Sequence, residues 1–212
     1  MKKVQERMVV FPSPGGGMLE GLYHKGERGD AAGMVIAAPH PRMGGAMDSP
    51  VVAEMAFASA RDQRPTLRFN YRGVGASLGY LAGGDTTEEV ADFGAAVEEL
   101  RATTGVRATV AAGYSFGARV ALTFALADAE VAAVVLIAPP TSLFAFDDLA
   151  RLRVPALLVI GQHDEHTDRA ALSAIAAHSG AARVEVVGGA DHVFNQGLVS
   201  LSKAINEFLA SL

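Results

Sequence analysis

Short, continuous apolar runs recur along most of this 212-residue chain, and glycine or proline bounds several of them. They lack the alternation of apolar and polar positions that is typical of a strand with one solvated face. Such runs predict strands that are buried on both faces of a parallel sheet. The predicted strands of this kind are Met34 to Ala38, Ala108 to Ala112, Val131 to Ala138, Ala156 to Ile160 and Val184 to Val187. Thr66 to Tyr71 is a further candidate strand, because Pro65 stands at its start, where a missing N–H does least harm.

Between these runs the apolar period changes to that of amphipathic helices. Pro50 suits the first position of a helix that Ser49 can cap. Thr86 and Glu89 have the spacing of a capping box, and an apolar stripe follows them. The last such stripe consists of Leu198, Leu201, Ile205, Phe208 and Leu212. Alternation of strands and helices predicts an α/β protein with a doubly wound, mostly parallel sheet.

The first thirty residues follow a different pattern. Two apolar stretches, Met8 to Phe11 and Met18 to Tyr23, flank the turn-forming segment Pro12 to Gly17. This arrangement predicts an antiparallel hairpin at one edge of the sheet. No internal repeat, linker or low-complexity tail interrupts the sequence, so residues 1–212 are expected to form a single domain.

Composition and charge narrow the classes of function. Half of the residues are hydrophobic and 19% are charged, which excludes an intrinsically disordered chain. The net charge of −5 argues against nucleic-acid binding. Cysteine is absent, so thiolate chemistry and disulfides are excluded. Glu6 and Arg7 interrupt the apolar stretch of a signal peptide, and no run approaches the ~18 residues of a membrane span; we expect a cytoplasmic protein that binds no membrane.

Residues Gly113 to Gly117 read Gly-Tyr-Ser-Phe-Gly and match the pattern G-x-S-x-G. They follow a predicted strand and precede a helical pattern that begins at Ala118. A serine on such a sharp turn projects its Oγ above the sheet, beside backbone N–H groups and the positive end of a helix. The two glycines are needed because side chains there would collide with neighbouring backbone. Ser115 is therefore predicted to be a nucleophile, rather than a small residue that packs a helix on a strand.

A serine nucleophile needs a base, and the base needs an acid that orients it. Asp164 and His192 each follow a predicted strand at its carboxyl end, where open α/β sheets place their sites. Glu165 remains an alternative to Asp164 as the acid. His163 and His166 flank these carboxylates, but four consecutive residues on one loop rarely converge on an ion, so neither a metal nor another cofactor is expected.

Three other titratable residues are interpreted as structural. Asp191, beside His192, is interpreted as a loop aspartate that accepts local backbone hydrogen bonds. His24 and His178 are expected at the surface.

An oxyanion hole needs two N–H donors aimed at the developing negative charge. The residue after the nucleophile, Phe116, should supply one, and the loop from His40 to Gly45 the other. Pro41 has no N–H, so Arg42 is the expected donor and Met43 the alternative. His40 is interpreted either as a substrate contact or as a side chain that supports its own loop.

Five segments together resemble the small α/β-hydrolases without a lid of the dienelactone-hydrolase-like group, in particular bacterial hydrolases and esterases with few insertions. These segments are Ala38 to Pro41 with Gly44 and Gly45, Arg68 to Gly75 with Ser77 and Gly79, Gly113 to Gly117, Gly161 with Asp164, and Asp191-His192 with Phe194. The resemblance implies a Ser115–Asp164–His192 triad and hydrolysis of an ester-like bond through an acyl-enzyme. Because dienelactone hydrolases usually carry a cysteine nucleophile, a lactone substrate is not implied.

The segment Gly73 to Gly79 is superficially similar to a dinucleotide-binding fingerprint. Its third glycine is one position late and no amphipathic helix begins there, so a nicotinamide cofactor is not expected.

The connection in which this fold usually carries a cap domain is short here, from Pro139 to Pro155. It has room for one short helix and no lid, so we expect an open site for short- to medium-chain acyl esters. The expected walls are Met43, Tyr114, Leu143, Phe144, Phe146 and Phe194, although Phe144 and Phe146 are equally interpretable as core residues.

The leading hypothesis is a serine hydrolase of the carboxylesterase type that acts on a small molecule. The same groups would also serve a serine peptidase, a thioesterase or an acyltransferase. The alternative from a different functional class is a protein with this fold that has no catalytic activity and binds a ligand or a partner. A homodimer is possible only on the ground that symmetric dimers are common among soluble proteins.

Overall fold

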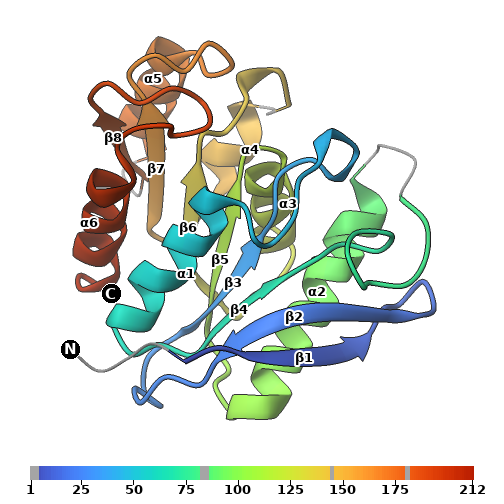
Figure 1. Ribbon diagram of the computed structural model, residues 1–212. Helices are drawn as coiled ribbons and strands as arrows, with labels where there is room; N and C mark the ends of the chain where they lie inside the picture. The colour runs from blue at the N-terminus through green and yellow to red at the C-terminus, as the bar shows by residue number, and fades with distance from the viewer. Residues whose placement is uncertain (1–4, 82–85, 144–145, 180–181) are drawn as a thin grey trace.

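The computed structural model describes residues 5–81, 86–143, 146–179 and 182–212 and places eight strands in one sheet (Figure 1). Their order is β1-β2-β4-β3-β5-β6-β7-β8. The antiparallel part contains β1 (Arg7–Pro12) and β2 (Met18–His24), and β2 also pairs antiparallel with β4. The parallel part comprises β3 (Gly33–Ala37), β4 (Thr66–Phe69), β5 (Thr109–Tyr114), β6 (Val131–Ile137), β7 (Ala156–Gly161) and β8 (Ala182–Val187).

Helices cover both faces of this sheet (Figure 1). One face packs against α2 (Thr87–Thr104), α3 (Phe116–Ala125), α4 (Phe146–Arg151) and α5 (Arg169–Ser179). The other packs against α1 (Pro50–Arg61) and α6 (Leu198–Leu209). Two short 3₁₀ turns, η1 (Pro41–Met43) and η2 (Thr141–Leu143), follow β3 and β6. The predicted doubly wound α/β architecture with an antiparallel hairpin is confirmed.

Successive residues of the central strands are buried on opposite faces. In β3, Met34 and Ile36 belong to the core under α1 and α6, whereas Val35 and Ala37 belong to the core under α2 and α3. All four side chains are fully buried, which explains why the sequence shows a continuous apolar run instead of an alternating one.

The last predicted strand departs from this rule. β8 lies at the edge of the sheet and pairs with β7 alone. Arg183 and Glu185 are exposed or half-buried, and Val186 is 42% exposed. The prediction that Val184 to Val187 is buried on both faces is therefore wrong, because an apolar run does not distinguish an edge strand from a central one.

The predicted capping box at the start of α2 is not formed. Thr86 takes the N-cap position in a left-handed conformation with φ of 68°, and its side chain makes no capping hydrogen bond. The side chain of Glu89 is buried instead of turning back to the cap. At α1, Ser49 and Pro50 occupy the predicted positions, although the Ser49 hydroxyl does not bond the helix.

Within the described ranges, no helix is both long enough and apolar enough to cross a membrane. The glycine-containing stretch after β4, residues 73–79, forms turns and bends, and no helix begins in it. This agrees with the expectation that no amphipathic helix begins at this stretch.

Candidate active site

Ser115 lies on the sharp turn between β5 and α3, with φ of 55° and ψ of −118°. A residue other than glycine in such a conformation costs about 1–3 kcal/mol, which the surrounding structure must offset. The backbone N–H of Ser115 donates to the carbonyl of Ile137 at 2.8 Å and ties the turn to β6. The strained backbone lifts the serine side chain to the carboxyl edge of the sheet.

The two flanking glycines make this turn possible. A Cβ on Gly113 would overlap the carbonyl group of Gly117, and a Cβ on Gly117 would overlap the carbonyl oxygens of Ala37 and Ala38. The predicted reason for both glycines is confirmed. The second contact also shows how closely the start of α3 packs against the end of β3.

The three side chains proposed from the sequence meet at this edge. The Oγ of Ser115 lies 3.0 Å from Nε2 of His192, and Nδ1 of His192 lies 3.0 Å from each carboxylate oxygen of Asp164. An ionised carboxylate only accepts hydrogen bonds, so Nδ1 carries the proton and Nε2 is free to accept from the serine hydroxyl. The arrangement can transfer a proton from Ser115 to His192.

Asp164 is held as an anion by several donors. Its side chain is 1% exposed. Burial alone would raise its pKa, but hydrogen bonds from His192, from the backbone N–H of His166 and from the Thr167 hydroxyl lower the pKa below its usual value. These donors lie 2.9–3.0 Å from the carboxylate oxygens.

The structure separates Asp164 from its neighbours on the same loop. Glu165 and His163 are exposed, and the carboxylate that contacts His192 belongs to Asp164. Asp191 accepts hydrogen bonds from the backbone N–H and side-chain amide of Asn195, as its structural interpretation predicted. In the described part of the chain, no three histidine or acidic side chains form a group that could hold a metal.

Of the two histidines expected at the surface, the structure describes the side chain of His24. This residue is half-buried in β2; its Nδ1 contacts the carbonyl of Gln5 at 3.0 Å, while Nε2 is buried without a hydrogen-bond partner among the described residues. Part of this cover comes from the segment before β1, because the carbonyl of Gln5 lies against the ring. The side chain of His178 lies outside the described residues.

The expected oxyanion donor Arg42 has its backbone N–H occupied. It donates to Nδ1 of His40 at 3.2 Å, within the turn η1. The N–H of Met43 donates to the carbonyl of His40 at 2.9 Å. In the part of the chain that the structure describes, the N–H groups of Phe116 and His40 make no hydrogen bond. The assignment of Arg42 is thus corrected, because the sequence did not reveal that His40 caps this turn.

The predicted walls of the site fall into two groups. Met43 and Leu143 are 84% and 42% exposed and can contact a substrate at an open site. Tyr114 and Phe194 are 5% and 1% exposed and belong to the core under α1 and α6, so they do not form an open wall. Phe144, predicted to bind substrate, lies outside the described residues, as does the side chain of Phe146.

Sequence reasoning missed two side chains beside the triad. Thr167 is buried, and its hydroxyl lies 3.0 Å from Asp164 and 3.1 Å from the carbonyl of Pro139. His166 places its ring edge-to-face against His192, with centroids 4.7 Å apart. A threonine three residues after the acid is a local signal for the first contact. No local signal predicts the second.

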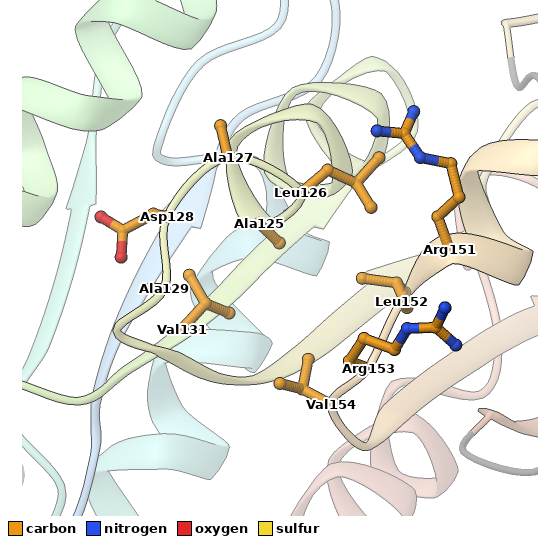
Figure 2. A pocket seen from close by; sticks show the side chains of 10 residues that line it. All are labelled: Ala125, Leu126, Ala127, Asp128, Ala129, Val131, Arg151, Leu152, Arg153 and Val154. Atoms are coloured by element: carbon orange, nitrogen blue, oxygen red, sulfur yellow. The ribbon is translucent and has the colours of Figure 1, made fainter.

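A separate pocket of about 290 Å³ lies at the other end of the sheet (Figure 2). It is formed where α3 ends and where β6 and β7 begin, so it is remote from Ser115. Leu126 and Leu152 contribute apolar side chains to the pocket, and Arg151 and Arg153 place positive charge on one side of it. None of the groups around His192 faces this pocket.

Comparison with known proteins agrees with this geometry. A family model described as the alpha/beta hydrolase fold matches residues 43–154. An uncharacterised protein of Rickettsia prowazekii is 28% identical over 214 residues, which cover 96% of this chain and 89% of the relative.

Solved structures of bacterial proteins also match over nearly the whole chain. An α/β serine hydrolase homologue from Coxiella burnetii is 28% identical with a TM-score of 0.86, covering 98% of this chain and 99% of that one. A serine hydrolase without a lid from Xanthomonas campestris is 26% identical with a TM-score of 0.83, covering 100% and 96%. The resemblance inferred from the sequence motifs is therefore confirmed: the chain belongs to the α/β-hydrolase fold family.

Proposed function

We propose that this protein is a serine hydrolase of the carboxylesterase type that cleaves short- to medium-chain acyl esters. The observation that carries the proposal is the continuous hydrogen-bonded series from Ser115 through His192 to the buried Asp164. A nucleophile, a base and an orienting acid at these distances form the arrangement that activates a serine hydroxyl.

The reaction would begin when Oγ of Ser115 attacks the ester carbonyl carbon and passes its proton to Nε2 of His192. The tetrahedral intermediate then expels the alcohol, which takes that proton from His192, and an acyl-enzyme remains. Water repeats the sequence: it loses a proton to His192, attacks the acyl carbon and releases the carboxylic acid as Ser115 regains its proton. The anionic Asp164 stabilises the imidazolium that forms in each half.

For the oxyanion hole we propose the backbone N–H groups of Phe116 and His40. Both lack hydrogen-bond partners among the described residues, and they come from the two segments that flank the serine. The rings of His40 and Phe116 are 4.6 Å apart, and the start of α3 packs against the end of β3. Two such donors would contact the negative oxygen of the tetrahedral intermediate.

The preference for small esters is supported by the surroundings of the triad. The connection between β6 and β7 is where this fold usually carries a lid. In this chain only η2 and α4 occupy the described part of that connection. Exposed apolar side chains follow β3, β6 and β8 at the carboxyl edge of the sheet: Met43, Leu143 and Val193. An open apolar rim suits a short acyl chain better than a buried tunnel would.

A fluorophosphonate probe measured by intact-protein mass tests this proposal. The activated serine attacks phosphorus and expels fluoride, so one adduct per chain is expected on the wild type. Ser115→Ala and His192→Ala should remove the adduct, whereas Ser173→Ala, at an exposed serine of α5, should keep it. A folded wild type that forms no adduct would favour the alternative, a silent scaffold that binds a ligand.

A substrate panel then separates the possible acyl substrates. We expect p-nitrophenyl esters of two to eight carbons to be hydrolysed, with amides and thioesters slower by at least tenfold. Faster cleavage of a peptide or of an acyl thioester, or acyl transfer to an added alcohol, would assign the protein to peptidases, thioesterases or acyltransferases.

A further inference from the structure

Tyr114 occupies a position in the site that substrate contact does not explain. It is the last residue of β5 and directly precedes Ser115. Its side chain is buried in the core under α1 and α6, and its hydroxyl donates to the backbone carbonyl of His192 at 3.0 Å. The rings of Tyr114 and His192 lie 5.9 Å apart at a tilt of 35°. One residue thus connects the nucleophile strand to the loop that carries the base.

The remaining attachments of this loop lead elsewhere. The N–H of Gly189 donates to the side chain of Gln162 at 2.9 Å, and the N–H of His163 donates to the carbonyl of Ala190 at 2.8 Å. Asp191 bonds Asn195 within the loop itself. These bonds fix the loop to the end of β7, but not to β5.

The strand order shows why a direct link to β5 matters. β6 and β7 separate β5 from β8, so the nucleophile and the base belong to strands that do not touch. Among the described residues, two hydrogen bonds link β5 and its turn to the base loop: the Ser115–His192 contact and the Tyr114 bond. The first is remade during each catalytic cycle, whereas the second can persist throughout.

We infer that Tyr114 is a positioning residue, whose hydroxyl holds the His192 carbonyl so that Nε2 stays within hydrogen-bond distance of Ser115 Oγ. The inference rests on the proposed serine hydrolase function. A tyrosine ring is rigid, with two side-chain torsions, and its buried position fixes the hydroxyl. A misplacement of about 1 Å in a reacting group can lower a rate by ~100-fold, so a fixed carbonyl beside the base has a direct effect on turnover.

The protonation state of the phenol suits this role. Burial, together with the negative charges of Asp164 and Asp191, raises the pKa of Tyr114 to about 12. The hydroxyl therefore remains a hydrogen-bond donor at every pH at which an ester hydrolase is assayed.

The test is Tyr114→Phe in the full chain, which removes one oxygen atom and keeps the ring. We expect kcat for p-nitrophenyl butyrate to fall about 10- to 100-fold while KM changes by less than twofold, because the base is displaced but the open acyl site is intact. The matched control is Tyr23→Phe, which makes the same change at a buried tyrosine of β2, remote from the triad. It should leave both constants unchanged.

Hydrogen exchange gives a readout that does not require catalysis. In Tyr114→Phe, amides of residues 188–195 should exchange at least fivefold faster than in the wild type, and those of β1 and β2 should not change. If the wild type neither hydrolyses esters nor reacts with the probe, this measurement still tests the link, and only the proposed function fails. An unchanged exchange rate, an unchanged kcat, or an equal fall of kcat in Tyr23→Phe would each overturn the inference.

Discussion

Thr167 allows a quantitative test of how the fold supports Asp164. Its single hydroxyl proton has two acceptors within reach: an oxygen of Asp164 at 3.0 Å and the carbonyl of Pro139 at 3.1 Å. A proton cannot serve both acceptors fully, and the charged carboxylate is the stronger one. Near neutral pH we therefore expect the hydroxyl to donate to Asp164.

The substitution Thr167→Val keeps the shape of this buried side chain and removes the donor. A hydrogen bond to a charged group contributes about 1.5–3 kcal/mol, and the lost bond leaves the carboxylate with the donors of His192 and His166. We expect the free energy of unfolding to fall by about 2 kcal/mol at pH 7. For a chain of this size that corresponds to a decrease in Tm of roughly 4–8 °C.

The pH dependence of this loss gives the stricter test. The pKa of Asp164 is lowered in the folded state, so its favourable contribution is present above the unfolded carboxyl pKa of about 3.9 and is lost as pH falls through the folded value. Once Asp164 is protonated, the hydroxyl retains the neutral acceptor at Pro139, a bond of about 1 kcal/mol. The difference between wild type and Thr167→Val should therefore shrink toward low pH.

Urea unfolding between pH 7 and pH 3, followed by circular dichroism, measures this difference. Thr167→Ser is the matched control because it keeps the hydroxyl, and its loss at pH 7 should be less than half that of the valine variant. A loss that is constant across pH, or equal in the two variants, would refute the argument that the charged bond to Asp164 dominates.

Three further predictions follow from single contacts. Asp164→Asn should lower kcat by at least 100-fold in an ester assay, because the buried anion no longer stabilises the His192 imidazolium; a loss below tenfold would contradict the role of Asp164. Gly117→Ala should lower the free energy of unfolding by more than about 2 kcal/mol in urea titrations, because its Cβ overlaps the carbonyl oxygens of Ala37 and Ala38; Gly44→Ala, in open space but at positive φ, should cost about 1 kcal/mol. Burial raises the pKa of Glu89, so its deprotonation destabilises the folded state as pH rises. The free energy of unfolding of Glu89→Gln, relative to that of the wild type, should therefore increase from pH 4 to pH 8. A difference that does not change with pH would show that burial does not perturb this carboxyl.

The sequence alone determined the features that depend on neighbouring residues in the chain. Continuous apolar runs predicted the buried strands, and the change of period predicted the helices between them. The turn at Ser115 was also predictable, because a tight strand-to-helix connection requires glycines at fixed positions and leaves few alternative residue types. The order of strands along the chain further placed Asp164 and His192 at the same edge of the sheet.

Only the tertiary structure decided the contacts between residues remote in sequence. Tyr114 and His192 are 78 positions apart, and nothing local to either residue reveals that the phenol turns inward to meet a carbonyl. The burial of Glu89 likewise depends on which surface α2 presents to the sheet. The physical reason is that a local pattern restricts backbone conformation and the buried face, whereas the direction and partner of one polar side chain depend on every element packed around it. The loop at His40 shows that a short-range contact can escape the sequence as well: Arg42 carries a suitable N–H, yet the fold of η1 directs that N–H to the ring of His40, two residues earlier.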